Sequence, residues 1–371
     1  DVSVADLVGD IDPIKAANLR LSFADERVIH YGIIPRSNRG IFVINELPDL
    51  QARIQVALFN ILEEGDVQIR GFKLRLPLDI LFVFTANPED YTNRGSIVTP
   101  LKDRIESQIL THYPKSIEQA LEITEQEAEI NDEQKAKVGI SDLVKRLIEQ
   151  VAFEARGSEM VDKKSGVSAR LTISAIENAV SAAERRAIIN REKQTQVWIS
   201  DLAGIIPSIT GKVELVYEGE QEGPFQVAMN LVDKAIRSQF IRYFPNPEVL
   251  KKRRNTGNPS AGEKKEENPY RPVTDWFDKG NNLNISFITS DKDKRLLLYK
   301  VDGLHALVKK YFPGANDEQA ALLMEFVLHG LASYSLISKK MFESKVEFKD
   351  LVGSMMNFGN RDFEEEFDEE A

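Results

Sequence analysis

Two apolar stretches of the sequence end in side chains that can handle a metal-bound phosphate and a water molecule. The residues Ile41 to Ile44 run directly into Asn45 and Glu46, and the stretch 81–84 is followed three residues later by Asn87. A carboxylate at the tip of a strand can activate water as a general base. An amide can donate a hydrogen bond to a phosphate oxygen and accept one from water. Together these residue types suit the activation of a water molecule beside an oxyanion such as a phosphate.

Both residues also have a purely structural interpretation. Glu46 could be an acid that the dipole of a following helix favours at its N-terminus. Asn87 could be a turn residue before Pro88, a common use of Asn-Pro. We prefer the catalytic interpretation of Glu46 and the water-positioning interpretation of Asn87, because each follows an apolar strand and other motifs accompany them.

The elements that would hold these residues alternate between strand and helix up to about residue 114. The run at 41–44 predicts a strand that is covered on both faces, and an amphipathic helix follows it. The alternation over 67–76 predicts a β-hairpin. A second buried strand over 79–87 and a third near Ile109 would complete a parallel α/β sheet with an inserted hairpin.

The pattern becomes helical after residue 115. Helical periodicity and capping residues predict helices at 116–130, 141–155, 172–193, 225–244, 303–311 and 317–338.

Three domains are therefore expected. They are an α/β core at 1–115, an all-helical lid at 116–216 and a mainly helical C-terminal region at 217–371. Within the last of these, 251–272 has the composition of a linker, and 360–371 is rich enough in acids to be a disordered tail.

Composition narrows the class of function. The net charge of -11 argues against general binding of nucleic acid, whose phosphates demand a basic face. The chain has no cysteine, which excludes disulfides and thiolate metal ligands and fits a reducing cytoplasm. No apolar run approaches the roughly 20 residues that cross a bilayer, so no membrane partner is expected. The four histidines are scattered without metal-ligand spacing.

Five motifs in order resemble those of an AAA+ ATPase, in the clade of the MoxR proteins and the magnesium chelatase I subunit. "DLVGDIDP" resembles the stretch after the second strand, and "RGIFVINELPDL" resembles Walker B. "VQIRGFKLRLPLDILFVFTANPED" resembles the pre-sensor-1 hairpin and sensor 1, "LKDRI" the arginine-finger segment, and "SGVSARLTISAIE" sensor 2 on the helical lid. The resemblance covers residues 1–216 and implies an α/β AAA+ core followed by a helical lid.

The resemblance implies a role for each site residue. Glu46 would activate the attacking water, and Asn87 would orient the same water. Asn45 stands where the family has an Asp that holds Mg²⁺. Because an amide keeps the oxygen but lacks the charge, it should hold Mg²⁺ more weakly, and slow hydrolysis or binding without hydrolysis stays open.

Two arginines would complete the site. Arg104 would be the arginine finger that reaches the γ-phosphate of a neighbouring subunit, and Arg170 would couple rotation of the lid to the nucleotide. Arg104 could instead pair at the surface with Asp103 or Glu106, and Arg170 could be a solvated arginine. Lys102 and Arg94 lie close enough in sequence to leave the assignment of the finger open by a residue.

The phosphate-binding loop of such enzymes is missing from these 371 residues. The sequence contains no Gly that is followed, after four residues, by Gly-Lys-Ser or Gly-Lys-Thr. The nearest stretch, "GIIPSITGKV", has the wrong spacing and ends in Val213. A sheet without the strand of this loop would have bare apolar faces. The chain also starts at Asp1, so we expect it to be a fragment or processed product, completed by upstream residues or by a partner.

The resemblance implies an ATP hydrolase that uses ATP and Mg²⁺, forms a ring, of six subunits in the usual case, and remodels or assembles a partner protein. It also implies a partner with a von Willebrand factor A domain. The alternative is a non-hydrolysing AAA+-like scaffold or regulatory binding module. A DNA-dependent motor using Arg70, Lys73 and Arg75 of the hairpin is conceivable, but the net charge argues against it.

Overall fold

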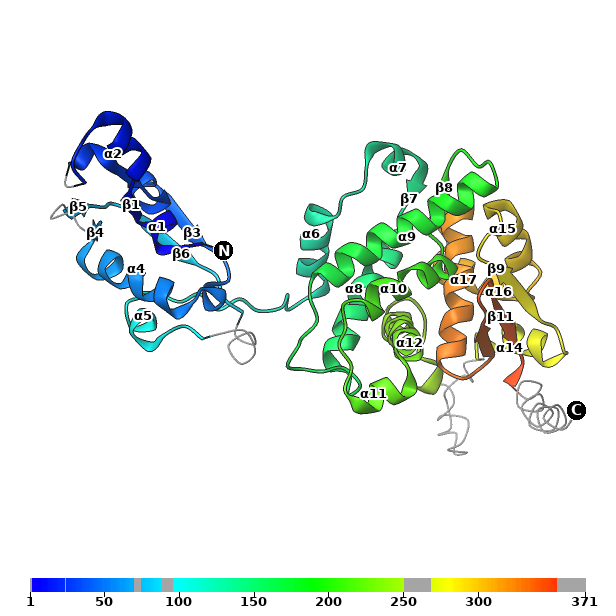
Figure 1. The fold of residues 1–371 in the computed structure, drawn as a ribbon. Helices are drawn as coiled ribbons and strands as arrows, with labels where there is room; N and C mark the ends of the chain where they lie inside the picture. The colour runs from blue at the N-terminus through cyan, green and yellow to red at the C-terminus, as the bar shows by residue number, and fades with distance from the viewer. Residues whose placement is uncertain (1, 24, 70–74, 88–95, 250–267, 352–371) are drawn as a thin grey trace, which may run out of the picture. The chain divides into compact units, whose positions relative to one another are not determined.

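The chain forms two compact units, each with its own hydrophobic core. The computed structural model describes residues 2–23, 25–69, 75–87, 96–249 and 268–351. Residues Asp1–His112 belong to unit 1 and residues Tyr113–Ala371 to unit 2 (Figure 1). The three-domain division predicted from the sequence stays a prediction, and the elements are described below unit by unit.

Unit 1 combines short strands with one long helix. Its elements are α1 (Val4–Leu7), β1 (Gly9–Ile11), α2 (Pro13–Leu19), η1 (Glu26–Val28), β2 (Ile29–Tyr31), α3 (Ile33–Arg36), β3 (Ile41–Ile44), η2 (Leu47–Asp49), α4 (Ala52–Glu64), β4 (Asp66–Gln68), β5 (Arg75–Pro77), β6 (Leu81–Phe84) and α5 (Thr99–Asp103).

The central feature of unit 1 is the parallel pair β3–β6, in which Ile41 lies opposite Leu81 and Ile44 opposite Phe84. One face of this pair packs on the core of the unit through Phe42, Ile44, Phe82 and Phe84. The same core takes in Ile54, Leu58 and Ile61, the buried residues along one side of α4. The predicted parallel arrangement of these two strands is thus confirmed.

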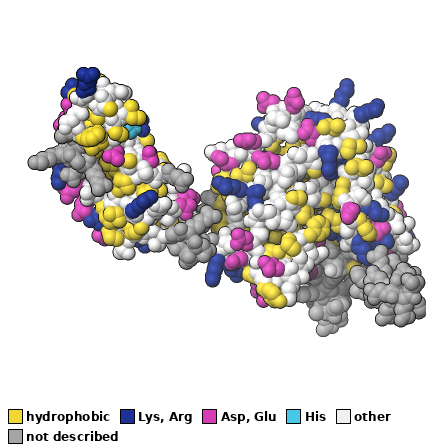
Figure 2. Space-filling view, viewed as in Figure 1, with side chains coloured by type: hydrophobic (Ala, Val, Ile, Leu, Met, Phe, Trp, Pro, Cys, Tyr) yellow, Lys and Arg dark blue, Asp and Glu magenta, His cyan; other side chains and the backbone are white. Residues whose placement is uncertain are grey.

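The other face of β3–β6 is exposed, so the prediction of strands covered on both faces is wrong. Ile41 is 67% exposed, Val43 53%, Leu81 61% and Val83 40%. Because alternate residues of a strand point to opposite faces, these four side chains share one face. We call them the bare face of β3–β6. Figure 2 shows hydrophobic side chains reaching the surface of unit 1.

The third predicted strand is also wrong. Residues 105–114 form no strand, and Ile109 is 91% exposed and Leu110 74% exposed. An apolar segment becomes a strand only when a neighbouring strand takes up its backbone hydrogen bonds, and no described residue does so here. The two arms of the predicted hairpin do pair: β4 and β5 are antiparallel, with Asp66 opposite Pro77. Residues 70–74 between them lie outside the described residues.

Unit 2 is built mainly of helices. Its elements are α6 (Ile117–Glu127), α7 (Asp132–Lys137), β7 (Val138–Gly139), α8 (Asp142–Gly157), α9 (Arg170–Ile189), β8 (Thr195–Gln196), η4 (Ile199–Ile205), α10 (Ile206–Thr210), α11 (Tyr217–Glu222), α12 (Pro224–Tyr243), α14 (Arg271–Asp278), β9 (Leu283–Ser286), α15 (Asp291–Tyr299), α16 (Leu304–Tyr311), α17 (Asp317–Ser333), β10 (Ser338–Met341) and β11 (Lys345–Lys349).

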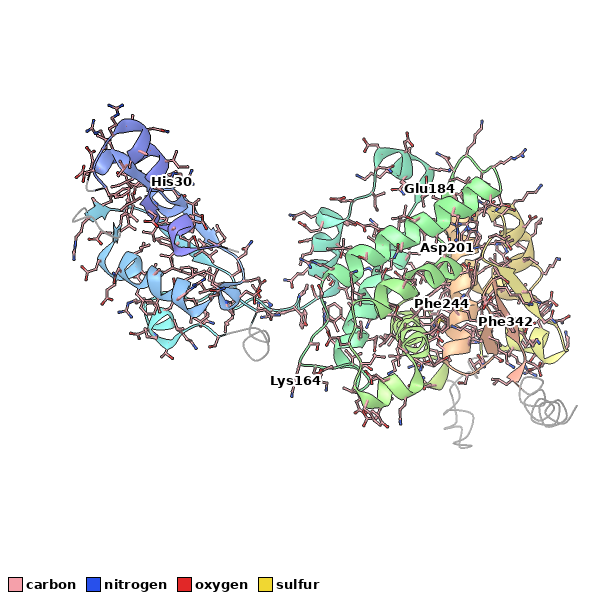
Figure 3. The ribbon with its side chains drawn as sticks, viewed as in Figure 1. His30, Lys164, Glu184, Asp201, Phe244 and Phe342 are labelled. Carbon is pink, nitrogen blue, oxygen red and sulfur yellow. The ribbon has the colours of Figure 1, made fainter. Side chains whose placement is uncertain are left out.

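The core of unit 2 draws residues from Val138 to Phe348, on both sides of the predicted boundary at residue 216. Helix α17 runs through it with consecutive buried residues from Ala320 to Leu331. Figure 3 shows Asp201 and Phe244 inside this unit, near α17. Most predicted helices lie close to observed ones.

Two strand groups in unit 2 depart from the predicted helical lid and C-terminal region. Strands β7 and β8 form a short parallel pair, so the segment 116–216 is not all-helical. Strands β10, β11 and β9 form an antiparallel sheet in that order. The predicted linker falls mostly on residues outside the described ones, although Arg271 already begins α14. The predicted acidic tail lies wholly outside them.

Candidate functional site

The candidate site lies where β3 and β6 end. In a parallel pair the carboxyl ends of both strands reach the same edge, so Asn45 and Glu46 follow β3 beside Thr85, which follows β6. Ladder hydrogen bonds continue past the strands: the Thr85 N–H donates to the Ile44 carbonyl at 3.0 Å, and the Leu47 N–H donates to the Thr85 carbonyl at 2.9 Å. The backbone of the two segments is therefore fixed side by side.

The side chain of Thr85 joins the two predicted residues. Its hydroxyl Oγ1 accepts a hydrogen bond from the Glu46 N–H at 3.0 Å and donates one to Asn45 Oδ1 at 3.4 Å. Sequence analysis missed Thr85. The available signal was its position, since a hydroxyl residue directly after one strand of a parallel pair can reach the end of the other.

Glu46 has a left-handed backbone, with φ 52° and ψ 56°. This conformation costs a residue with a Cβ about 1–2 kcal/mol, and such strain is concentrated at functional sites. The Thr85 hydrogen bond to the Glu46 N–H helps to hold it. The Glu46 side chain is exposed at the strand tip, which leaves its carboxylate open to water. A 3-10 turn, η2, follows it rather than a helix start, although α4 begins soon after.

Asn45 and Asn87 are both exposed at this edge. Asn45 presents an amide oxygen that already accepts from Thr85 and has a second lone pair for another donor or a cation. Asn87 is the last described residue before the gap at 88–95. Asn45 directly follows β3, and Asn87 lies three residues after the end of β6.

Arg104 follows α5 and is engaged within unit 1. Its guanidinium forms an ion pair with Glu63 of α4, and its Nη1 donates to the Pro100 carbonyl at 2.8 Å. The guanidinium also lies 5.3 Å from the ring centre of Phe59. The pairing partner is Glu63 rather than Asp103 or Glu106. An arginine finger would have to leave this ion pair, and the assignment to Arg104 stays a prediction.

Arg170 is the first residue of α9 in unit 2, and its side chain is exposed. Its N–H donates to Ser168 Oγ at 3.1 Å, which supports the turn that starts the helix. An exposed guanidinium at this position is free of the helix body and can meet an anion. The coupling role of Arg170 stays a prediction.

The residues present suit one part of a magnesium–nucleotide site. An amide oxygen, a carboxylate and a hydroxyl at a solvent-open edge are the oxygen ligands that Mg²⁺ uses together with water. The part that would cradle phosphates has no counterpart in the 371 residues, because no Gly-rich loop with Lys and Ser/Thr occurs. The residues at this edge therefore fit the metal and the water of such a site but not its phosphates.

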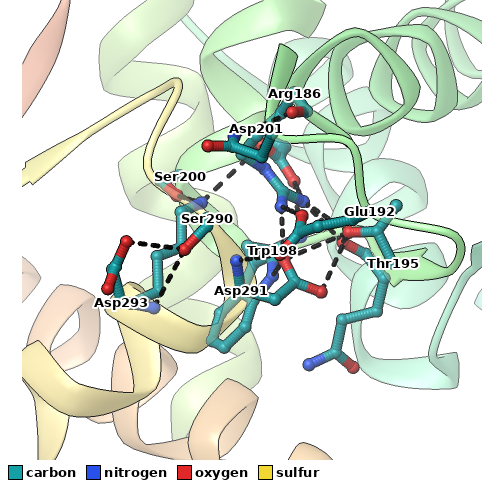
Figure 4. A network of polar contacts seen from close by, with 12 residues as sticks. Arg186, Glu192, Thr195, Trp198, Ser200, Asp201, Ser290, Asp291 and Asp293 are labelled. Carbon is teal, nitrogen blue, oxygen red and sulfur yellow. Dashed lines mark hydrogen bonds and ion pairs between the residues drawn. The ribbon is translucent and has the colours of Figure 1, made fainter. Parts of the chain in front are cut away.

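Unit 2 contains a buried cluster of charged and polar side chains (Figure 4). Arg186 Nε and Nη2 bond to the two oxygens of Asp201 at 3.2 and 3.0 Å, and Arg186 also pairs with Asp291. Trp198 Nε1 donates to Asp291 Oδ1 at 2.8 Å. Lys294, fully buried, donates to Ser200 Oγ at 2.7 Å.

The carboxylate of Glu325 completes the cluster, because it accepts from the Ile199 N–H at 2.8 Å. Burial raises the pKa of Glu325 and lowers that of Lys294. The charged groups of the cluster bond to one another and to the backbone across α9, η4, α15 and α17. We therefore interpret it as a structural tie between these elements.

Neither a membrane span nor a metal cluster emerges from the described residues. None of the helices that the structure describes is both long and apolar enough to cross a bilayer. Within the same residues no three His, Asp or Glu side chains are grouped so that they could hold a metal ion. Two cavities of about 260 and 390 Å³ lie in unit 2, and none of the predicted site residues lines either of them.

Comparison with known proteins gives little support for assigning this chain to a family or a function. No protein-family model matches the chain, and no curated protein matches it. A crystal structure from Cytophaga hutchinsonii, described as that of a "putative ATPase", is 21% identical, and the match covers 62% of this chain and 73% of that one with a TM-score of 0.24. At this identity and TM-score the similarity does not support a conclusion about the function of this chain.

Proposed function

We propose that this chain is part of an ATP hydrolase of the AAA+ class, similar to the MoxR proteins and the magnesium chelatase I subunit. The observation that supports the proposal is the parallel pair β3–β6, which brings Asn45, Glu46 and Thr85 to one edge of a sheet, with Asn87 just beyond. Glu46 activates the attacking water, Asn87 orients it, and Asn45 assists Mg²⁺.

The phosphate loop would come from a segment outside these 371 residues, in the same protein or in a partner. The bare face of β3–β6 favours this view, because four large apolar side chains on one face of a sheet are ordinarily covered by further strands or helices. A strand added beside β6 and parallel to it would place its own carboxyl end next to Thr85 and Asn87.

The wider function follows the same resemblance. The protein would assemble into a ring, with Arg104 acting on the nucleotide of the neighbouring subunit and Arg170 coupling the lid to it. Since Arg104 pairs with Glu63 in the isolated chain, ring formation would have to exchange that ion pair for the phosphate. A protein with a von Willebrand factor A domain is the proposed partner.

The test is ATP turnover by the intact protein with Mg²⁺, beside Glu46→Gln and beside Glu64→Gln, a matched control at an exposed residue of α4. We expect Glu46→Gln to lower kcat by about 100-fold or more, because general-base catalysis contributes about that much. Glu64→Gln should leave kcat unchanged. Equal turnover by wild type and Glu46→Gln would remove Glu46 from the reaction.

A non-hydrolysing scaffold is the second candidate, and Asn45 is the observation that favours it. With an amide in place of a carboxylate, Mg²⁺ loses a charged ligand at this edge. If the intact wild type binds ATP without turning it over, the scaffold is the better description. Asn45→Asp should then restore measurable turnover.

A further inference from the structure

Tyr113, the first residue of unit 2, is bonded to the loop that leads into α9. Its hydroxyl accepts a hydrogen bond from the Val167 N–H at 2.8 Å. Val167 is 1% exposed and lies three residues before Arg170, where α9 begins. Because a buried N–H without an acceptor is costly, this bond helps to fix the backbone of the loop just ahead of Arg170, together with the β-bridge between Val167 and Val213.

The guanidinium of Arg156, from α8, lies over the ring of Tyr113. The guanidinium lies 4.2 Å from the ring centre of Tyr113 and 5.3 Å from that of Phe153. Among the described residues, Arg156 Nε and Nη1 are buried and have no hydrogen-bond partner, so the two aromatic rings contribute to holding this cation. Tyr113 is thus fixed both to α8 and to the loop before α9.

The backbone of the loop before α9 leaves room for the Tyr113 hydroxyl. Gly166 has φ +72°, a conformation that favours glycine, and a Cβ at this position would collide with the Tyr113 hydroxyl. Figure 3 shows Lys164 on the same loop, at its outer end. The close approach at Gly166 and the bond at Val167 are adjacent, so the contact involves two consecutive residues of the loop.

We propose that Tyr113 is a positioning residue that ties the junction of the two units to the start of α9, and that the placement of Arg170 depends on it. The chain passes from unit 1 to unit 2 between His112 and Tyr113. A movement of the chain at this junction therefore reaches Val167 and the first turn of α9 through the Tyr113 hydroxyl, in addition to the contact of Tyr113 with Arg156. The nucleotide part of this inference rests on the proposed function, because it uses Arg170 as the residue that meets the phosphate.

The link itself is tested by amide hydrogen exchange of the intact protein without nucleotide. Tyr113→Phe removes the acceptor of the Val167 N–H and keeps the ring for Arg156. We expect exchange in the peptide 165–171 to become about tenfold faster, the effect of one lost buried hydrogen bond. Tyr217→Phe is the control, since it removes the hydroxyl of an exposed tyrosine of α11 and should not change this peptide. Unchanged exchange in Tyr113→Phe would overturn the link.

The dependence of Arg170 is tested by a double-mutant cycle on the KM for ATP. Tyr113→Phe should raise KM about fivefold in the wild-type background and have no effect in the Arg170→Ala background. A rise of the same size in both backgrounds would show that Tyr113 does not act through Arg170. If the wild type turns over no ATP, the proposed function and the nucleotide role of Arg170 fail together, while the exchange result still decides whether Tyr113 holds the loop.

Discussion

At the scale of single residues, Glu46 combines a side chain placed for chemistry with a backbone conformation that lowers stability. Its carboxylate is exposed where two parallel strands end, and its backbone has the left-handed conformation that favours glycine. A residue chosen for stability alone would be glycine. A strained residue other than glycine at a strand end is one of the observations that support the catalytic role proposed for Glu46.

This strain predicts an unusual order of stability among variants. Glu46→Gly should make unit 1 about 1 kcal/mol more stable than Glu46→Ala, because only alanine has a Cβ in the left-handed conformation. At Asp49, in the neighbouring 3-10 turn, the order should reverse, since glycine there only adds freedom to the unfolded chain. Hydrogen exchange of the α4 amides measures both pairs. Equal protection in the two Glu46 variants would show that the backbone is not strained.

The sequence could place Glu46 and Asn87 but could not place Thr85. The first two follow apolar runs that end at recognisable points, so local pattern was enough. The contact between Thr85 and Glu46 joins residues 39 positions apart and depends on the register of β3 with β6. Register is a property of the packed sheet, and a single sequence does not contain it in readable form.

At the scale of elements, the errors have a common cause. Ile109 and Leu110 have the composition of a strand, yet no described neighbour pairs with them. The strands of the C-terminal sheet, such as "SKKM" and "KVEFK", are short and rich in lysine, so their composition gave no sign of a sheet. Long helices with an apolar side, such as α8, were predictable because their periodicity is local. Whether a short segment becomes a strand is decided by its partner.

The buried polar cluster predicts a large cost when its central cation is removed. Arg186→Met would remove the guanidinium that pairs with both Asp201 and Asp291 in the interior, which should destabilise unit 2 by about 3–5 kcal/mol. Arg185→Met, its exposed neighbour, should change stability by less than about 0.5 kcal/mol. Urea unfolding followed by tryptophan fluorescence suits this test, because both tryptophans, Trp198 and Trp276, lie in unit 2. Similar midpoints for the two variants would contradict the structural role of the cluster.

At the scale of the whole molecule, His329 makes the stability of unit 2 depend on pH. Its imidazole is 3% exposed, both ring nitrogens lack a hydrogen-bond partner in the described part of the chain, and it lies edge-on to Phe348. Burial lowers the pKa of His329 well below its usual value, and the nearby cations Lys339 and Lys294 add to the effect. The folded state therefore keeps this histidine neutral.

The sign of the pH effect follows from linkage. Below about pH 6.5 the unfolded chain takes up a proton that the folded chain refuses, so stability falls by up to about 1.4 kcal/mol per pH unit. His329→Leu should flatten this part of the curve. Leu331→Met, a neutral change in the same helix, should shift the curve without flattening it. Urea midpoints measured from pH 7.5 down to pH 5 would distinguish these results, and an unaltered slope in His329→Leu would exclude His329 as the source.

The bare face of β3–β6 affects how unit 1 associates with other copies in solution. Four apolar side chains on one face, beside strands with unpaired backbone groups among the described residues, form a template on which another copy can build. Produced at high concentration without whatever covers this face, the chain should self-associate by stacking and edge pairing, and added salt should strengthen rather than weaken that association. The extent of aggregation would then report how much of the apolar face of β3–β6 is left uncovered.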